Sequence, residues 1–173
     1  MQIDLPAIPL QKISDPITSK QGVNLYVLRA DLNHPHISGN KLYKLKYNLQ
    51  AASRANKGTL LTFGGAFSNH IAAVAAAGKT YGFKTIGIIR GEKYEPLNPT
   101  LQFATDQGMH LEYVSRELYR QKEELMRYVK HKYGDTVFLI PEGGSNELGI
   151  LGCKEIIRHI PVNFDHICCA CGT

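Results

Sequence analysis

Alternating strand and helix patterns predict an α/β fold with a mostly parallel sheet. Four short apolar runs begin near residues 60, 85, 111 and 137, and segments with helical periodicity separate them. Asn, Ser or Pro stands at the start of several helical segments and Gly at the end, as expected for helix caps and stops. The sequence therefore predicts a small domain of three layers around a parallel sheet.

The expected helices and strands alternate regularly from residue 42 onward, and one further strand is expected before that point. The strands are expected at residues 25–28, 59–63, 85–89, 111–114, 137–140 and 166–171, and the helices at 42–57, 71–82, 99–107, 116–133 and 148–159. The N-terminal segment and the last strand do not fit the rhythm of the four central strands. We therefore assign residues 46–160 to a small α/β domain. Residues 1–45 and 161–173 are assigned to an incomplete portion of a larger α/β domain.

Composition narrows the class of protein. The 173 residues are 43% hydrophobic and 20% charged, which is typical of a globular chain. No apolar run approaches the roughly 20 residues that span a membrane, and no secretory signal opens the sequence. The net charge is +5, but the basic residues are scattered among acidic ones. We expect no nucleic-acid or membrane partner, whereas an anionic substrate and cofactor would suit this charge.

Three of the four cysteines gather at the end of the chain. Cys168 and Cys171 have the C-x-x-C spacing, but no second pair of ligands follows them. The run Ile167-Cys168-Cys169-Ala170-Cys171 is interpreted as a buried strand rather than a metal or redox site. Unpaired cysteines favour a reducing, cytoplasmic location. His34 and His36 have H-x-H spacing without a nearby acidic or cysteine ligand, so we expect a loop there.

Lys41 is the first candidate for chemistry. It follows the flexible segment Ser38-Gly39-Asn40 at a helix start, with Lys44 and Lys46 close behind. A lysine must be neutral to act as a nucleophile, and both neighbouring cations and a helix N-terminus disfavour its protonation. Considered on spacing alone, an ordinary surface lysine at a helix start is the better explanation of this pattern.

The second candidate is a glycine-rich turn. Gly64-Gly65-Ala66-Phe67-Ser68-Asn69-His70 follows a strand and opens a helix, where free backbone N–H groups form an anion site. Gly143-Gly144-Ser145-Asn146 repeats this arrangement after a later strand. Either turn by itself is also compatible with a purely structural role. Neither matches G-x-G-x-x-G, and the chain has no G-x-S-x-G, so neither a dinucleotide site nor a serine hydrolase is indicated.

Taken together and in order, five segments resemble one known family. They are Leu28-Arg29-Ala30-Asp31-Leu32, then Ser38-Gly39-Asn40-Lys41 with Lys44-Leu45, then Gly64-Gly65 with Ser68-Asn69-His70, then Pro141-Glu142-Gly143-Gly144-Ser145-Asn146 with Leu148-Gly149 and Gly152, then Cys171-Gly172-Thr173. The sequence resembles the 1-aminocyclopropane-1-carboxylate deaminase and D-cysteine desulfhydrase family. Its members are pyridoxal 5'-phosphate enzymes of fold type II, with a tryptophan-synthase-β-like fold. The resemblance covers the whole chain but only the first half of a typical member.

The resemblance implies roles for individual residues. Lys41 would be the lysine that forms the Schiff base with pyridoxal phosphate, and Asn69 would hydrogen-bond the ring hydroxyl of the cofactor. Ser68, with Asn69 and His70, would bind the substrate carboxylate, and Ser68 would also serve in proton transfer. Gly172 and Thr173 would open the loop that binds the cofactor phosphate. Deaminases of the cyclopropane amino acid tend to carry Gln where this chain has His70, which favours a desulfhydrase-like member.

The resemblance implies an enzyme that acts on a small amino acid and releases a 2-oxo acid and ammonia, and a homodimer when the fold is complete. We expect the 173-residue chain to be inactive alone. Two alternatives stay open from the sequence. One is another enzyme of the same fold type, such as a β-replacing synthase or a dehydratase. The other is a non-catalytic ligand-binding or scaffold fragment.

Overall fold

The computed structural model describes residues 1–169 and contains a four-stranded parallel sheet in the order β5-β4-β3-β6. The strands are β3 (Thr59–Gly64), β4 (Lys84–Arg90), β5 (Met109–Val114) and β6 (Val137–Leu139). In register, Leu61 lies opposite Ile86 of β4 and Leu139 of β6. All four strands were predicted, and the α/β class with a parallel sheet is confirmed.

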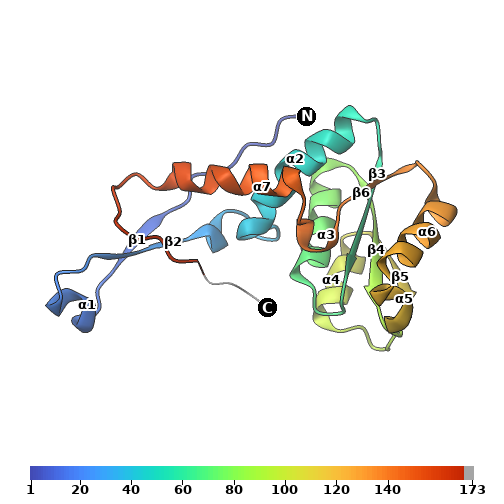
Figure 1. Ribbon diagram of the computed structural model, residues 1–173, viewed down its shortest axis with the longest axis horizontal. Coiled ribbons are helices and arrows are strands. Elements are labelled where there is room, and N and C mark those ends of the chain that lie inside the picture. The colour runs from blue at the N-terminus through green and yellow to red at the C-terminus, as the bar shows by residue number, and fades with distance from the viewer. Residues whose placement is uncertain (170–173) are drawn as a thin grey trace.

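Helices cover both faces of this sheet (Figure 1). On one face lie α2 (Asn40–Arg54), α3 (Asn69–Tyr81) and α4 (Pro99–Asp106); on the other lie α5 (Arg116–Arg120) and α6 (Lys122–Tyr133). The first face buries α2 leucines and the alanine-rich side of α3, whose small side chains let helix and sheet approach closely. The second face buries Leu61, Ile88, Tyr119, Leu125 and Val129. The small domain therefore has the expected three layers.

A buried carboxylate links the second face of the sheet to α6. Glu112 of β5 accepts hydrogen bonds from the hydroxyls of Tyr128 and Tyr133, and Lys132 Nζ donates to it over 2.6 Å. Burial acts to raise the pKa of Glu112, but these donors outweigh burial and hold the pKa below its ordinary value. The Glu112 side chain is therefore charged, and as a carboxylate it holds α6 on the sheet.

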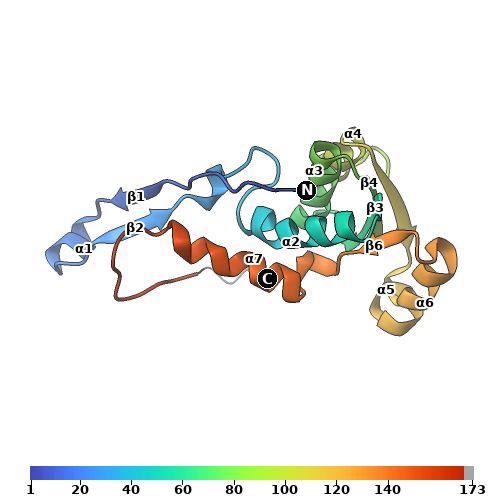
Figure 2. The ribbon, with the colours of Figure 1, turned by 90° about the horizontal axis from the view of Figure 1, so that it is seen from above.

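The N-terminal segment forms a separate arm that projects away from the sheet (Figures 1 and 2). It consists of β1 (Leu10–Ile13), α1 (Pro16–Lys20) and β2 (Leu25–Leu28), and β1 pairs with β2 antiparallel. The arm then leads into the short 3-10 helix η1 (Ala30–Leu32). The strand β2 was predicted, whereas β1 and α1 were not.

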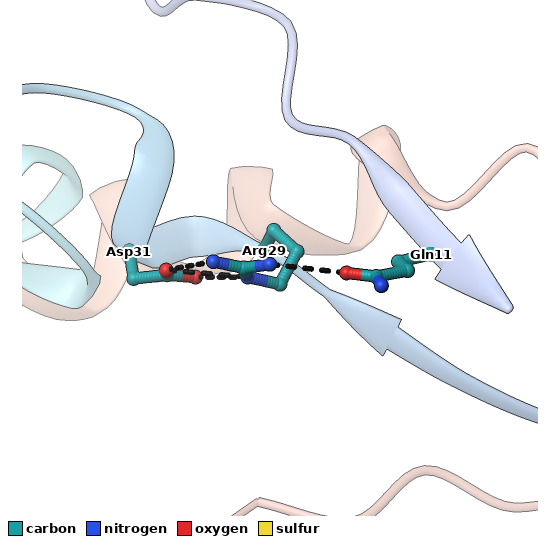
Figure 3. A network of polar contacts seen from close by, with 3 residues as sticks. All are labelled: Gln11, Arg29 and Asp31. Carbon is teal, nitrogen blue, oxygen red and sulfur yellow. Dashed lines mark hydrogen bonds and ion pairs between the residues drawn. The ribbon is translucent and has the colours of Figure 1, made fainter. Parts of the chain in front are cut away.

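One guanidinium joins the two strands of the arm at the base (Figure 3). Arg29 donates to both carboxylate oxygens of Asp31, with Nη2 to Oδ2 at 2.7 Å, and its Nη1 donates to Gln11 Oε1 over 3.0 Å. The backbone N–H of Arg29 also donates to the Pro9 carbonyl. These contacts set the path of the chain from the arm towards α2.

Three expected elements differ from the structure. The helix expected over 116–133 is broken at Gln121, which has φ −83° and ψ 79°, and this bend lets Tyr119 and Leu125 both enter the core. The last helix is α7 (Glu147–Cys153) continued by the 3-10 helix η3 (Lys154–His159). The strand expected over 166–171 is absent from its described part, because residues 166–169 are exposed and have no neighbouring strand to pair with. The domain boundaries themselves stay a prediction.

Candidate functional site

The strand order points to a ligand site at the carboxyl end of β3. The chain proceeds from β3 to β4 on one side and β6 lies on the other side, so the direction of the strand connections reverses at β3. In open parallel sheets, ligands bind outside the carboxyl ends of the strands at such a point. The two glycine-rich turns picked out from the sequence, at residues 64–70 and 143–146, are these two loops.

The first turn prepares the N-terminus of α3. Ser68 is the N-cap, and its Oγ accepts a hydrogen bond from the Ile71 N–H over 3.4 Å. The turn can fold back this tightly because residue 64 is glycine: a Cβ there would lie 2.7 Å from Ser68 Oγ. Asn69 opens the helix and is exposed. The Ser68 cap takes up the Ile71 N–H, and binding of a carboxylate by the first turn of α3 stays a prediction.

His70 joins the two loops through a buried polar contact. Its side chain is 3% exposed, and Nε2 lies 2.8 Å from Thr62 Oγ1. The Thr62 hydroxyl donates to the Ile140 carbonyl over 2.9 Å, so it accepts from His70 Nε2–H. Nδ1 is buried and has no hydrogen-bond partner within residues 1–169. The role of His70 as a substrate ligand stays a prediction.

Burial and nearby charge keep the His70 ring neutral. Burial first, and then the positive charges of Lys41 and Lys44, lower the pKa of His70 to about 3, while the Pro141 carbonyl acts in the opposite direction. Both lysines of α2 therefore lie close enough to act on the first turn of α3. The structure thus brings Lys41 together with the α3 N-terminus, which the sequence left as separate motifs.

Lys41 lies in the first turn of α2 and is partly buried. The helix begins where Gly39 adopts a positive φ of 66°, and Lys41 Nζ donates to Asn40 Oδ1 over 2.9 Å. Burial first, and then the charge of Lys44, lower the pKa of Lys41 below its ordinary value of 10.5. This environment favours the neutral amine that nucleophilic attack requires.

Lys44 contributes more than the sequence indicated. Its Nζ donates to the Gly143 carbonyl over 3.1 Å and to Ser145 Oγ over 3.4 Å. A Cβ at Gly144 would lie 3.3 Å from His70 Cε1 and 3.4 Å from Lys44 Cβ, so glycine is needed for this close approach. Lys44 therefore positions the second loop against α2. Its spacing of three residues from Lys41, on one side of a helix, could have indicated this.

The remaining motif residues of the second loop serve packing. Asn146 caps α7 through the Gly149 N–H and exchanges two hydrogen bonds with the buried Asn48 of α2. A Cβ at Gly152 would lie 1.9 Å from the Tyr43 carbonyl oxygen. Gly152 thus allows α7 to lie directly against α2, and Gly149 allows the second loop to fold back onto α7, where a Cβ would lie 2.2 Å from the Gly144 carbonyl oxygen.

A surface pocket of about 440 Å³ adjoins these loops. It is lined by Lys44, Gly144, Ser145, Gly149, Ile150, Cys153 and Lys154. Burial raises the pKa of the Cys153 thiol, and the two nearby lysines, Lys44 and Lys41, act in the opposite direction. The pocket thus lies between Lys44 of α2, the second loop and α7.

Other predicted residues are placed as follows. Gly172 and Thr173, expected in the phosphate loop, lie outside the described residues. His34 Nδ1 accepts hydrogen bonds from the N–H groups of His36 and Ile37, which is the predicted loop role. Within residues 1–169 no cluster of His, Cys, Asp or Glu could hold a metal ion, and no helix there is long and apolar enough to cross a membrane.

Comparisons with known proteins point to one family, although no protein-family model matches the sequence. A candidate 1-aminocyclopropane-1-carboxylate deaminase of Thermotoga maritima is 36% identical over all of this chain and 58% of its own length. A bifunctional D-cysteine desulfhydrase/1-aminocyclopropane-1-carboxylate deaminase of Arabidopsis thaliana is 32% identical over 88% of this chain. The crystal structure of an ACC deaminase homologue, 28% identical, superposes on 92% of this chain with a TM-score of 0.72.

The chain belongs to the 1-aminocyclopropane-1-carboxylate deaminase and D-cysteine desulfhydrase family. It spans about half the length of the curated relatives it matches, with 58% of the Thermotoga protein and 43% of the Arabidopsis protein covered. A maize serine racemase, 16% identical with a TM-score of 0.66, shares the fold. The family predicted from five short motifs is thus confirmed.

Proposed function

We propose that this chain supplies the reactive lysine and the small domain of a pyridoxal-phosphate enzyme that deaminates a small amino acid. The observation that carries the proposal is the environment of Lys41. Its pKa is lowered by burial and by Lys44, and it lies close to His70 in the first turn of α3. The names of the relatives support the reaction class, because they include a deaminase, a D-cysteine desulfhydrase and one protein with both activities.

The residues present fit pyridoxal phosphate. The cofactor is an anionic aldehyde, so it needs a neutral amine for covalent attachment and cationic surroundings for its charge. Lys41 meets the first need and Lys44 the second. The buried His70 Nδ1, which has no hydrogen-bond partner within residues 1–169, supports a polar ligand at these loops, and glycine at residue 144 lets the second loop lie close to His70 and Lys44. When bound, the cofactor supplies a ring that withdraws electrons from the substrate Cα.

The residues of this chain would then divide the work. Lys41 would hold the cofactor covalently through its amine. The Ser68 hydroxyl and the first N–H groups of α3 bind and orient the substrate carboxylate. Ser68 moves a proton at the reacting end of the substrate, and Asn69 hydrogen-bonds the cofactor ring. His70 remains neutral and, by its contact with Thr62, holds the α3 turn beside the second loop.

The substrate would be 1-aminocyclopropane-1-carboxylate or D-cysteine, the two compounds in the names of the relatives. His70, in place of the Gln of the cyclopropane deaminases, makes D-cysteine our preferred substrate. We further propose a homodimer for the complete fold and a cytoplasmic location, which the free thiols of Cys153 and Cys168 support.

The test uses a chimera in which this chain is joined to the part of the Thermotoga maritima relative with which it does not align. After incubation with pyridoxal phosphate and borohydride, peptide mapping should find the cofactor on Lys41. Attachment to Lys44 or Lys46 instead would refute the assignment. Lys41→Arg should abolish attachment, since a guanidinium is always charged. Release of 2-oxo acid from D-cysteine, but not from O-acetylserine, would separate a desulfhydrase from a β-replacing synthase.

Ser68→Ala in the same chimera should keep cofactor attachment but lower turnover by roughly 10² or more, the usual range for a positioned acid–base group. Ser115→Ala is the matched control, because Ser115 also caps a helix, α5, but on the opposite face of the sheet. Turnover near normal in the Ser68 variant would contradict its role.

A further inference from the structure

A second pocket lies on the face of the sheet that α6 covers, across the sheet from α2 and α3 (Figure 1). It has a volume of about 290 Å³ and lies where β3 and β6 end. Its lining residues are Phe63, Lys122, Leu125, Met126, Leu139, Pro141 and Glu142. Side chains alternate along β3, so Thr62 contacts His70 whereas Phe63 lines this pocket. The α6 pocket, as we call it, is therefore separate from the Lys41 site, although both lie at the end of β3.

The floor of the α6 pocket is apolar. Phe63 is 5% exposed and Leu125 2%, and Leu139 and Pro141 extend the floor towards β6. Met126 is 41% exposed at the edge, and methionine adapts well to the shape of a ligand. Pockets for small ligands are mostly apolar with a few polar groups, and this volume is at the lower end of their usual range. The pocket therefore suits a compound of the size of an amino acid.

Two opposite charges stand at the rim of this floor. Lys122 Nζ donates to Glu142 Oε2 over 3.3 Å, and the two side chains are 64% and 49% exposed. An ion pair as exposed as this one contributes little to stability. It can therefore open for a ligand that offers each partner a replacement.

A buried hydroxyl lies beside the negative group of the rim. Tyr119 is 3% exposed, and its hydroxyl has no partner at hydrogen-bonding geometry within residues 1–169. Burial first, and then the nearby Glu142 carboxylate, raise the pKa of Tyr119 above its ordinary value. Lys122 Nζ lies 4.7 Å from the centre of the Tyr119 ring. Because buried polar groups are nearly always hydrogen-bonded, a ligand group held between Glu142 and Tyr119 would satisfy this hydroxyl.

We propose that the α6 pocket binds a free α-amino acid with an apolar side chain of the size of leucine or methionine. Its carboxylate pairs with Lys122 and its ammonium group with Glu142, while its side chain covers the apolar floor. An apolar acid would separate Lys122 from Glu142 and leave Glu142 without a new partner, and an apolar amine would do the same to Lys122. A phosphorylated ligand would bring its negative charge next to the Glu142 carboxylate. The two charges and the floor together therefore select a zwitterion.

Glu142 connects the α6 pocket to the Lys41 site. It begins the 3-10 helix η2 (Glu142–Gly144), and the carbonyl of the next residue, Gly143, accepts a hydrogen bond from Lys44 Nζ. The carbonyl of the preceding residue, Pro141, acts on the His70 ring. A ligand that holds Glu142 therefore acts on the loop that contacts both Lys44 and His70. We expect the bound amino acid to regulate the Lys41 site without being its substrate.

The test is NMR of this chain with ¹³C-labelled leucine and methionine methyl groups during titration with L-leucine. The methyl signals of Leu125, Met126 and Leu139 should shift in a saturable way at millimolar concentrations. Those of Leu60, which is buried on the other face of the sheet, should stay in place. The absence of saturable shifts in the three pocket residues would overturn the proposal.

Two analogues of leucine test whether the pocket recognises a zwitterion. Isocaproate lacks the ammonium group and isoamylamine lacks the carboxylate. Each should bind more weakly than L-leucine by about tenfold or more, because each leaves one charge of the rim without a partner. Equal binding of the three compounds would overturn the proposal, since the pocket would then be an apolar groove only.

Variants of the rim make the test specific. Glu142→Gln and Lys122→Met each remove one charge and should weaken binding of L-leucine by about tenfold or more. Glu123→Gln and Lys130→Met remove the same charges from parts of α6 that do not line the pocket, and should leave binding within about twofold. Equal effects of rim and control variants would contradict the proposed contacts. The unchanged Leu60 signals report that each variant is folded.

A last variant separates this proposal from the proposed function. Lys41→Arg should leave the affinity for L-leucine unchanged, because Lys41 does not line the α6 pocket. Loss of the leucine-induced shifts in Lys41→Arg would overturn the proposal, since the ligand would then bind at the Lys41 site. The measurement needs no cofactor, so it succeeds or fails independently of the role of Lys41.

Discussion

The small domain and the arm differ in whether their apolar strands are covered by other parts of the chain. In the small domain each apolar run has a partner in the same chain: Leu61 and Phe63 lie under α5 and α6, and Leu60 lies under α3. In the arm, strands of similar apolar character leave their side chains exposed. The difference shows that one region of this chain carries its own core. The other leaves its apolar side chains uncovered within the described residues.

The candidate site lies in the small domain, the region that carries its own core. Its first loop is fixed by β3 and the Ser68 cap, and its second by Lys44 and the Asn48–Asn146 pair. Lys41 stands at the junction, since α2 packs on the small domain and the chain before it leads to the arm. The site is therefore partly formed while the apolar side chains of the arm are exposed.

The contact between α2 and α7 should be the most sensitive part of the folded region. Gly152→Ala would place a Cβ 1.9 Å from the Tyr43 carbonyl oxygen, and neither backbone can yield without separating the helices. We expect a loss of about 4 kcal/mol in the free energy of unfolding. Gly58→Ala, with nothing near its Cβ and no positive φ, is the matched control and should change stability by less than about 0.5 kcal/mol. Equal effects in urea titrations would contradict the close packing.

A pair of leucine substitutions tests the division itself. Leu61→Ala removes a fully buried side chain from the sheet and should cost about 3 kcal/mol. Leu25→Ala in the arm should cost less than about 0.5 kcal/mol in the chain alone, because that side chain is already exposed. If chemical denaturation shows a large loss for Leu25→Ala, the arm has a partner within this chain and the comparison is wrong.

Glu112 gives a smaller, pH-dependent effect within the small domain. Glu112→Gln should lower the free energy of unfolding at pH 7 by about 2 kcal/mol, because three donors lose a charged acceptor. The folded-state pKa is lowered, so this stabilisation is complete above the ordinary value of 4.5 and is lost as the pH falls through the lowered pKa. The difference between wild type and variant should therefore shrink on acidification. A difference that stays constant from pH 7 to pH 3 would refute this role.

The sequence predicted those parts of the fold that local patterns specify. Asn98, Ser68 and Ser115 cap α4, α3 and α5, in line with the Asn and Ser residues expected at helix starts, and the four central strands lie in the predicted runs. The strand β1 was missed because Leu10-Gln11-Lys12-Ile13 is only half apolar, and α1 because five residues show no periodicity. The final strand was wrong over residues 166–169 because a strand needs a neighbour as well as an apolar sequence.

The candidate site likewise has parts that local sequence indicates and parts that depend on contacts between distant residues. Lys41 and Ser68 stand beside local glycine turns that made them candidates, and the resemblance of five segments in order implied their roles. The contact of Lys44 with Gly143 spans 99 residues, and the Thr62 bond to Ile140 spans 78, so neither can be read from neighbouring sequence. The polar Thr62 inside an apolar strand was the visible sign of such a contact.

The most direct test of the account is the pKa of the Lys41 amine in this chain, measured by NMR after reductive methylation with ¹³C-formaldehyde and assigned with Lys41→Arg. We expect a value below 10.5, since burial and the charge of Lys44 both disfavour the ammonium form. Lys44→Met should raise it. A Lys41 pKa at or above 10.5 that does not respond to Lys44→Met would contradict the claim that this fold prepares Lys41 as a nucleophile.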